Sequence, residues 1–352
     1  MKANFNHNQL GSLGSVAGNT VRVFLGLILI TWLGVTSVSA LSPVVKLAPG
    51  LTSQEIQQAL DGLPASGGEV ILSTGVYLIH DPIVLHRDNQ ALRGTGDTTV
   101  LYLTDHANCP VIILGEPVNS PSHITRHLLV TGFFVDGNRR NQDRELWKER
   151  GEGSEIRNNG ITIQAVSDSL VENVTCARNR SGGLVTTLGV EHLTVRGLNA
   201  YDNEFDGLAC YLTTNSRFID LYLHDNPGAG ISLDLAFNHN VISNAVLTAN
   251  DLGVFMRASR ENRFDDITIR SSHHYGVFMA HAEEQTAQGW GPAPQTACVD
   301  NAFTNLAANH CGSAAFRVNN ITCTNNVLVS AKFDTNQLSG LSEAQPDLVT
   351  LR

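Results

Sequence analysis

The chain has 352 residues, of which 42% are hydrophobic, a proportion typical of a globular protein with a large core. Its 33 acidic residues outnumber 23 basic ones, and the net charge of −10 gives no support to nucleic-acid binding, which normally shows a basic surface.

The first feature along the chain is an apolar run at residues 23–39, VFLGLILITWLGVTSVS. It follows Arg22 and ends in small residues up to Ala40, the pattern of a secretory signal. We expect residues 1–40 to be a signal peptide and residues 41–352 to be secreted, periplasmic or extracellular, without stable membrane insertion. The alternative is an uncleaved N-terminal anchor, which also places the mature part outside the cytoplasm.

Two further segments precede the regular part of the chain. Residues 51–63, LTSQEIQQALDGL, have the spacing of an amphipathic helix, and strand-like stretches follow at 67–79 and 89–103. Residues 139–158 form an irregular stretch with many charges of both signs, which we interpret as a loop insertion.

From Gly160 onward the chain repeats a unit that opens with Gly and an alternating strand. The repeat glycines are Gly160, Gly183, Gly207, Gly230, Gly253 and Gly276. Their spacings are 23, 24, 23, 23 and 23 residues, and each opening strand is followed by a second apolar stretch and a polar turn. Short strands with Asn- and Gly-rich turns predict one coil of a parallel β-solenoid per repeat. Such coils stack and share one core.

With these repeats, the chain resembles the right-handed parallel β-helix proteins of the pectate-lyase-like superfamily. Residues 51–63 resemble the helix that caps the first coil in that family, and the likeness extends over about residues 47–335. The resemblance implies an all-β, single-domain solenoid with an N-terminal capping helix. It does not imply one activity, because the fold hosts lyases, hydrolases, epimerases, phage tailspikes and adhesins.

Stacking turns the repeat into columns of side chains about 4.8 Å apart. The outward position four residues after each repeat Gly is Gln164, Thr187, Tyr211, Asp234, Arg257 and Ala280, here called the column. Tyr211, Asp234 and Arg257 are consecutive in the column, so we predict a polar triplet on one face. Its alternative is a solvated cross-strand ion pair without a function.

A second outward position flanks the column and supplies candidate substrate contacts. It carries Phe255 and Phe278, and Arg317 follows in a later coil. Small residues such as Ser232 lie beside Asp234, and an aromatic wall over a small-residue floor suits a sugar ring. We therefore expect Gln164, Phe255, Phe278 and Arg317 to bind substrate.

A second insertion at 281–297 interrupts the repeat after the Gly276 coil. Long loops in a compact repeat are often functional, and the two insertions are placed to wall both sides of the triplet. Each contains one tryptophan, Trp147 and Trp290, that we expect to serve as a sugar platform, with loop anchoring as the alternative.

The tyrosine, carboxylate and guanidinium of the triplet favour a lyase or epimerase acting on a uronic-acid-containing polysaccharide. Arg257 supplies the cation that neutralises the uronate carboxylate, and Tyr211 or His281 supplies the base or acid. Asp234 holds Arg257 or tunes the tyrosine.

The alternative enzyme class is a glycoside hydrolase or transferase that pairs Asp234 with a second carboxyl. Glu283 and Glu284 in one insertion, or Glu145 and Glu152 in the other, are the candidates. Asp206 is five positions back along the strand direction, which at about 3.3 Å per residue is too far without a bend. A third alternative is a non-catalytic glycan-binding surface protein.

Family motifs do not choose among these activities. The paired aspartates of polygalacturonases are missing from the column, since Asp265 and Asp266 belong to another strand, and the Asp-Pro-His motif of alginate epimerases is absent. One Asp in the column is a poor match for the oxygen-rich shell of Ca²⁺, so we expect no metal and no other cofactor.

Two structural features complete the expectations. Asn179, Asn203 and Asn226 recur four residues before a repeat Gly, which predicts a stacked asparagine ladder at a turn. Cys298 and Cys323 occupy the same point of adjacent coils, where a disulfide and two buried thiols are equally expected.

Overall fold

The computed structural model describes residues 43–146, 156–282, 295–333 and 349–351. The predicted signal peptide lies outside these residues. No helix among them is long and apolar enough to cross a membrane.

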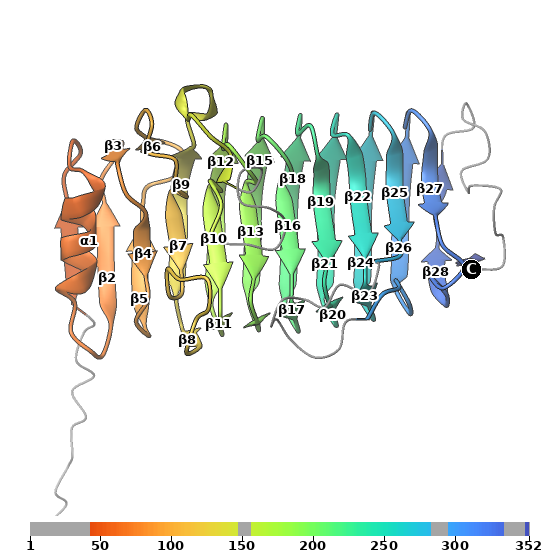
Figure 1. The fold of residues 1–352 in the computed structure, drawn as a ribbon, viewed down its shortest axis with the longest axis horizontal. Helices are drawn as coiled ribbons and strands as arrows, with labels where there is room; N and C mark the ends of the chain where they lie inside the picture. The colour runs from red at the N-terminus through yellow and green to blue at the C-terminus, as the bar shows by residue number, and fades with distance from the viewer. Residues whose placement is uncertain (1–42, 147–155, 283–294, 334–348, 352) are drawn as a thin grey trace, which may run out of the picture. The chain divides into compact units, whose positions relative to one another are not determined.

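The described chain winds into coils whose strands pair in parallel between successive turns of the solenoid (Figure 1). Three parallel sheets form the sides of the stack, and we name them A, B and C. Sheet B carries the Gly-led strands and is formed by β4 (Ile83–Leu85), β7 (Ile112–Leu114), β10 (Ile161–Gln164), β13 (Leu184–Thr187), β16 (Leu208–Tyr211), β19 (Ala229–Asp234), β22 (Leu252–Arg257), β25 (Tyr275–Ala280) and β27 (Ala314–Val318).

Sheet A is the widest of the three, and its central strands are eight residues long. It comprises β1 (Val44–Leu47), β2 (Gly68–Leu72), β3 (Gly75–Ile79), β5 (Gln90–Arg93), β6 (Thr99–Leu103), β9 (Leu129–Asp136), β12 (Leu170–Ala177), β15 (Thr194–Tyr201), β18 (Arg217–His224), β21 (Val241–Thr248), β24 (Arg263–Arg270), β26 (Ala302–Asn309), β28 (Asn326–Val329), β29 (Lys332–Phe333) and β30 (Val349–Leu351). Sheet C comprises β8 (Thr125–Arg126), β11 (Val166–Ser167), β14 (Val190–Glu191), β17 (Thr213–Thr214), β20 (Phe237–Asn238) and β23 (Ser259–Arg260).

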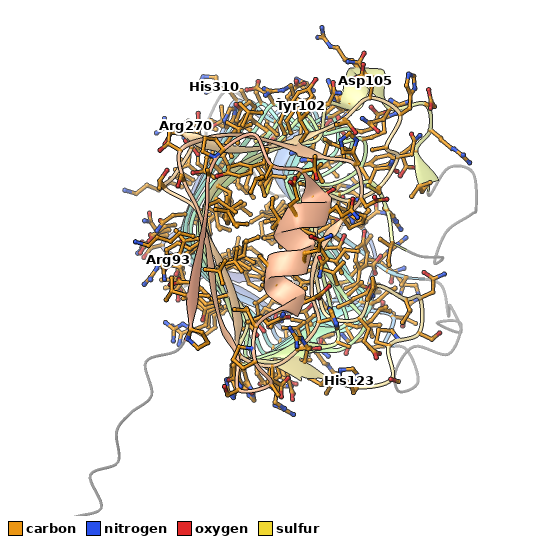
Figure 2. The ribbon with its side chains drawn as sticks, turned by 90° about the vertical axis from the view of Figure 1, so that its left-hand side faces the viewer. Arg93, Tyr102, Asp105, His123, Arg270 and His310 are labelled. Atoms are coloured by element: carbon orange, nitrogen blue, oxygen red, sulfur yellow. The ribbon has the colours of Figure 1, made fainter. Side chains whose placement is uncertain are left out.

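Helix α1 (Ser53–Asp61) covers the N-terminal end of the core, as expected for a cap (Figure 2). The Glu55 carboxylate accepts the Thr52 N–H at 2.8 Å, which satisfies a donor at the helix start. Ile56 and Leu60 are fully buried, so the apolar face of the helix closes the first coils against water.

The alternation expected for the Gly-led strands is present in the core. Leu208 and Cys210 on β16, and Ile231 and Leu233 on β19, point inward and are fully buried. Larger side chains stack between coils, such as Phe264 and Phe303, whose ring centroids are 4.2 Å apart. The fold is therefore the predicted all-β parallel solenoid with one continuous core.

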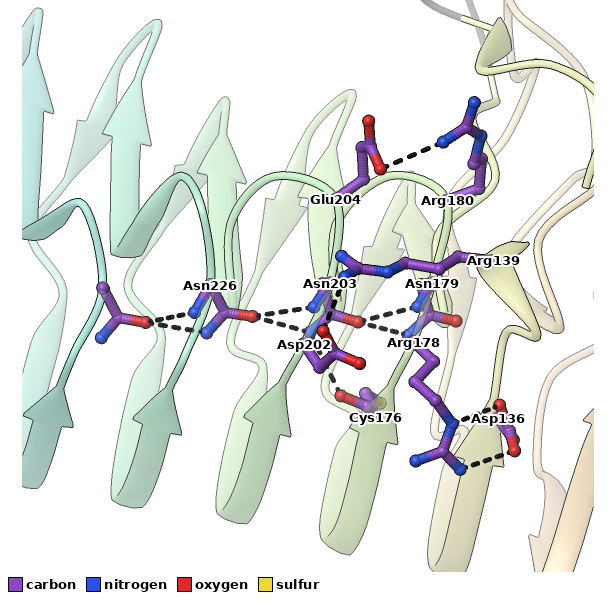
Figure 3. Close-up of polar contacts among 11 residues, drawn as sticks. Asp136, Arg139, Cys176, Arg178, Asn179, Arg180, Asp202, Asn203, Glu204 and Asn226 are labelled. Atoms are coloured by element: carbon purple, nitrogen blue, oxygen red, sulfur yellow. Dashed lines mark hydrogen bonds and ion pairs between the residues drawn. The ribbon is translucent and has the colours of Figure 1, made fainter.

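The predicted asparagine ladder is confirmed at the turn from sheet A to sheet B (Figure 3). The Nδ2 of Asn203 donates to Oδ1 of Asn226 at 3.0 Å, and that of Asn226 donates to Oδ1 of Asn250 at 2.9 Å. A second ladder that we did not predict runs along the turn from sheet C to sheet A, through Asn240, Asn262, Asn301 and Asn326. Both ladders hold buried backbone groups at the coil corners.

Candidate functional site

Tyr211, Asp234 and Arg257 end the adjacent strands β16, β19 and β22, as the repeat predicts. Tyr211 pairs in register with Asp234, and the Asp234 Oδ2 accepts hydrogen bonds from Nε of Arg257 at 2.8 Å and from its Nη2. The Asp234 side chain is 3% exposed and the Arg257 side chain 28%. The ion pair is thus largely buried. Removing one partner of a buried ion pair lowers the stability of the fold, because the remaining charge is left without its partner.

The turn after Asp234 has a bulge that the sequence did not predict. The Asp234 Oδ1 accepts the Leu235 N–H at 2.8 Å, and Leu235 and Ala236 both have left-handed φ values, 47° and 67°. In the two adjacent coils a single left-handed residue, Leu212 or Ala258, makes the same turn. The extra residue therefore places the backbone strain at Leu235 and Ala236, directly after Asp234, and bulges of this kind are frequent next to functional sites.

Tyr211 is half-buried at the end of β16. Burial raises the pKa of its phenol, Asp206 and Asp234 raise it further, and Arg157 and Arg257 oppose the shift. The phenol is therefore protonated at neutral pH, and as a weak acid it can donate its proton only to a strongly basic atom such as a departing alkoxide oxygen.

Arg157 and Asp206 are site residues that the sequence analysis missed or rejected. Asp206 is half-buried before β16 and accepts the Ala229 N–H at 2.7 Å. Burial raises the pKa of its carboxyl to about 6, against the opposing effects of that hydrogen bond and of Arg157. Charges on Arg157 and Asp206 also act on Tyr211, so both lie near Tyr211 on the side of β16 where the strand begins.

The raised pKa of Asp206 predicts a pH-dependent gain in stability for Asp206→Asn. The carboxyl has a folded pKa of about 6 against an ordinary 3.8, so its ionisation costs stability above pH 6, and that cost disappears as pH falls toward 4. The amide keeps an oxygen for the Ala229 N–H. We expect Asp206→Asn to raise the free energy of unfolding by about 2 kcal/mol at pH 7.5 and by nothing at pH 4, measured by urea denaturation. Equal effects at both pH values would contradict the burial of this carboxyl.

The expected aromatic wall stands beside the triplet. Phe255 and Phe278 pair in register, and their rings stack with centroids 6.1 Å apart and planes 11° apart. The Arg257 guanidinium lies 5.7 Å from the centre of the Phe255 ring, and that of Arg317 lies 5.8 Å from the centre of the Tyr275 ring. The floor next to it is made of Val185, Ala209 and Ser232, whose exposure is 7%, 3% and 7%.

Gln164 and His281 are not placed as we expected. Gln164 is 1% exposed, and its amide donates to the carbonyls of Glu116 and Val118, so the 115–118 segment covers it. The Gln164 amide is therefore bonded to the protein's own backbone, and its binding to substrate stays a prediction. His281 follows β25, three coils from Tyr211 or about 14 Å at the strand spacing, and its ring is bonded to the Thr322 hydroxyl at 3.0 Å.

The remaining candidates lie in the insertions. Trp147, Glu152, Glu283, Glu284 and Trp290 lie outside the described residues. Glu145 is described and buried, at 3% exposure.

The described ends of the two insertions approach the column from opposite ends of its strands. Arg157, at the end of the first insertion, acts on Asp206 ahead of β16. Gln295, in the second, donates to Oδ1 of Asn238 at 2.6 Å and to the Ala258 carbonyl, just beyond Asp234 and Arg257. This arrangement is consistent with walls on both sides of the triplet.

The start of the first insertion is anchored where the sheet A strands β9, β12 and β15 end, beside a cavity of about 240 Å³. Figure 3 shows the ion pairs there. Arg139 pairs with Asp202 two coils away, and Arg178 pairs with Asp136, both at 2.6 Å. Tyr102, on β6, also lines this cavity. The cavity contains none of the residues that we predicted for the site. Within the described part of the chain, no group of three His, Cys, Asp or Glu side chains forms a metal site.

Comparisons with known proteins bear on the fold. A family model described as the right-handed beta helix region matches residues 132–254. The matched coils therefore form a right-handed parallel β-helix, as the sequence predicts. No curated protein matches the chain.

Several solved structures share this β-helix. The A-module of a mannuronan C-5 epimerase from Azotobacter vinelandii is 16% identical, with a TM-score of 0.55 over 85% of this chain and 93% of that one. An alginate lyase from Paenibacillus is 10% identical, with a TM-score of 0.58 over 87% of this chain and 99% of that one. A fragment of bacteriophage phi29 gene product 12 is 15% identical, with a TM-score of 0.61 over 85% of this chain and 52% of that one. Identities this low show a shared fold and leave the activity to the site.

Proposed function

We propose that this β-helix protein is a lyase or epimerase that acts on a uronic-acid-containing polysaccharide. The observation that carries the proposal is the buried Asp234–Arg257 ion pair next to the protonated Tyr211, on a strand face that Arg157 and Asp206 also reach. The epimerase and the alginate lyase that share the fold support this choice of substrate class.

Both reactions begin with loss of the proton next to the uronate carboxylate. That step needs a cation to stabilise the negative charge that develops on the carboxylate. Arg257 binds a uronate carboxylate and Asp234 fixes the orientation of its guanidinium, with Arg157 as the second cation of the site. A guanidinium presents two parallel donors to a carboxylate, which positions the sugar as well as neutralising it.

Asp206 and Tyr211 then divide the proton transfers. A carboxyl with a pKa of about 6 is ionised at neutral pH yet basic enough to take the proton, so Asp206 is the base. Asp206 bonds to Ala229 at the start of β19, so Arg157 is the cation beside it. Arg257, beside the far end of β19, holds the carboxylate of a neighbouring uronate. The Tyr211 phenol donates its proton to the departing glycosidic oxygen as the carbon–oxygen bond breaks and a carbon–carbon double bond forms. In an epimerase it instead returns a proton to the opposite face of the same carbon.

A second candidate, a glycoside hydrolase or transferase, is favoured by one observation. Two carboxyls near Tyr211 have separate environments, since Asp234 is paired with Arg257 whereas burial raises the pKa of Asp206. Two carboxyls whose environments differ in this way can serve as the acid and the base of glycoside hydrolysis.

We further propose that the protein works outside the cytoplasm, in keeping with the signal-like run at 23–39, and that side chains carry the chemistry without a resident cofactor. A parallel reaction with a chelator, in which activity should be unchanged, tests the latter.

Mass spectrometry of reaction products tests the proposal. The full chain and its Asp234→Asn variant are incubated with uronate polymers and with neutral glycans. We expect unsaturated fragments, or deuterium uptake from heavy water into an intact polymer, only with uronate substrates and at least about 100-fold more slowly in the variant. Fragments that carry an added water would establish the hydrolase instead. Binding without any conversion would overturn both and favour a glycan-binding protein.

A further inference from the structure

Cys298 and Cys323 converge inside the coil that follows the second insertion. The Cys298 N–H donates to the Cys323 sulfur at 3.4 Å, and the sulfurs of Cys298 and Cys323 lie 3.7 and 3.6 Å from the same atom, the Ala280 carbonyl oxygen. Both residues are fully buried, and all six cysteines are free thiols in the structure. The two side chains come from adjacent coils and converge on one oxygen atom, which meets the requirement that the cysteines of a disulfide point toward each other.

The chemistry of the pair is suited to thiol–disulfide exchange. A hydrogen bond from the Cys298 thiol is the main cause that lowers the pKa of Cys323 to about 7. Burial raises the pKa of Cys298 well above its ordinary value, so Cys298 holds the proton and Cys323 supplies the thiolate. The thiolate is the nucleophile in exchange, and it is most effective with a pKa near the ambient pH.

We propose that Cys298 and Cys323 form a disulfide as the chain folds, before both thiols are buried, by exchange with a small-molecule disulfide such as oxidised glutathione. The Cys323 thiolate attacks one sulfur of the oxidant and releases one thiolate. Cys298 then loses its proton and attacks the mixed disulfide at Cys323, which forms the intramolecular bond and releases the second thiolate. One oxidised glutathione is reduced to two glutathiones for each bond formed.

The bond would fasten the end of the second insertion beside the candidate site. Ala280, whose carbonyl contacts both thiols, pairs in register with Arg257. Gln295, three residues before Cys298, is bonded to Asn238 and Ala258 in the turns that follow Asp234 and Arg257. The disulfide would therefore join the segment 295–298 to the next coil, on the side of the solenoid that carries the column.

Thiol trapping after redox equilibration tests the proposal. The full chain is refolded in a series of oxidised and reduced glutathione mixtures, alkylated in denaturant, digested and analysed by mass spectrometry. We expect a peptide linked through Cys298 and Cys323. Cys176 on β12 and Cys210 on β16 lie in different sheets, so both should be alkylated and serve as internal controls. A cross-link between these residues closes a loop of about 25 residues, so oxidation should raise the melting temperature by about 5 °C, and Cys323→Ser should abolish the rise.

Three results would overturn the proposal. The first is complete alkylation of Cys298 and Cys323 at every redox ratio in the refolded protein. The second is a link from either residue to a third cysteine such as Cys311. Since Cys298→Ala and Cys323→Ser each remove only one thiol, a melting temperature that still responds to oxidation in both variants would equally contradict it.

Discussion

Arg257→Ala is expected to lower kcat/KM on a uronate polymer by about 1,000-fold, the largest effect that we predict on activity. The change removes a cation that binds a substrate carboxylate. It also leaves the Asp234 carboxylate, whose side chain is 3% exposed, without that partner in a buried position. Steady-state kinetics measured by product mass spectrometry would give the value.

A second variant separates this catalytic effect from a loss of folding. Breaking a buried ion pair costs about 3–5 kcal/mol, whereas replacing both partners with apolar residues is often neutral. The double variant Asp234→Leu with Arg257→Met should therefore melt near the parent protein and remain inactive. Arg263→Ala, which disrupts an exposed pair with Asp265 on sheet A, is the matched control and should keep full activity. If the double variant were stable and active, the ion pair would be structural alone.

Asn226→Ala is expected to lower the free energy of unfolding by about 3 kcal/mol, a large effect for a residue outside the candidate site. The Asn226 side chain accepts hydrogen bonds from the backbone N–H and the side chain of Asn203. It donates to the Ala200 carbonyl and to Asn250. The residue is 1% exposed, so water cannot replace these partners.

Urea denaturation followed by both circular dichroism and fluorescence would measure this loss, because stacked repeats can lose two-state behaviour. Asn244→Ala is the matched control. Asn244 bonds to Asp220 on the exposed surface, and its removal should change stability by no more than about 0.5 kcal/mol. Equal losses for the two variants would show that the ladder adds nothing beyond an ordinary surface hydrogen bond.

Most of the architecture follows from the sequence alone. Parallel coils pair in register, so the spacing of the repeat glycines determines which residues are neighbours in space, and the two-residue period of a strand determines which of them face outward. Tyr211, Asp234, Arg257, Phe255 and Phe278 were therefore placed correctly without any knowledge of the loops. The Asn179–Asn226 ladder was predictable for the same reason.

Only the tertiary structure decided what surrounds those residues. The pairing of Asp234 with Arg257, the bulge at Leu235 and the proximity of Arg157 to Asp206 depend on side-chain orientation and on the path of an insertion that has no periodicity. Gln164 has the right position in the column but is covered by the 115–118 segment, some 46 residues earlier in the chain. A repeat defines positions within coils through local hydrogen bonds, whereas the burial and charge of a site depend on contacts between segments whose spacing in the sequence carries no regular pattern.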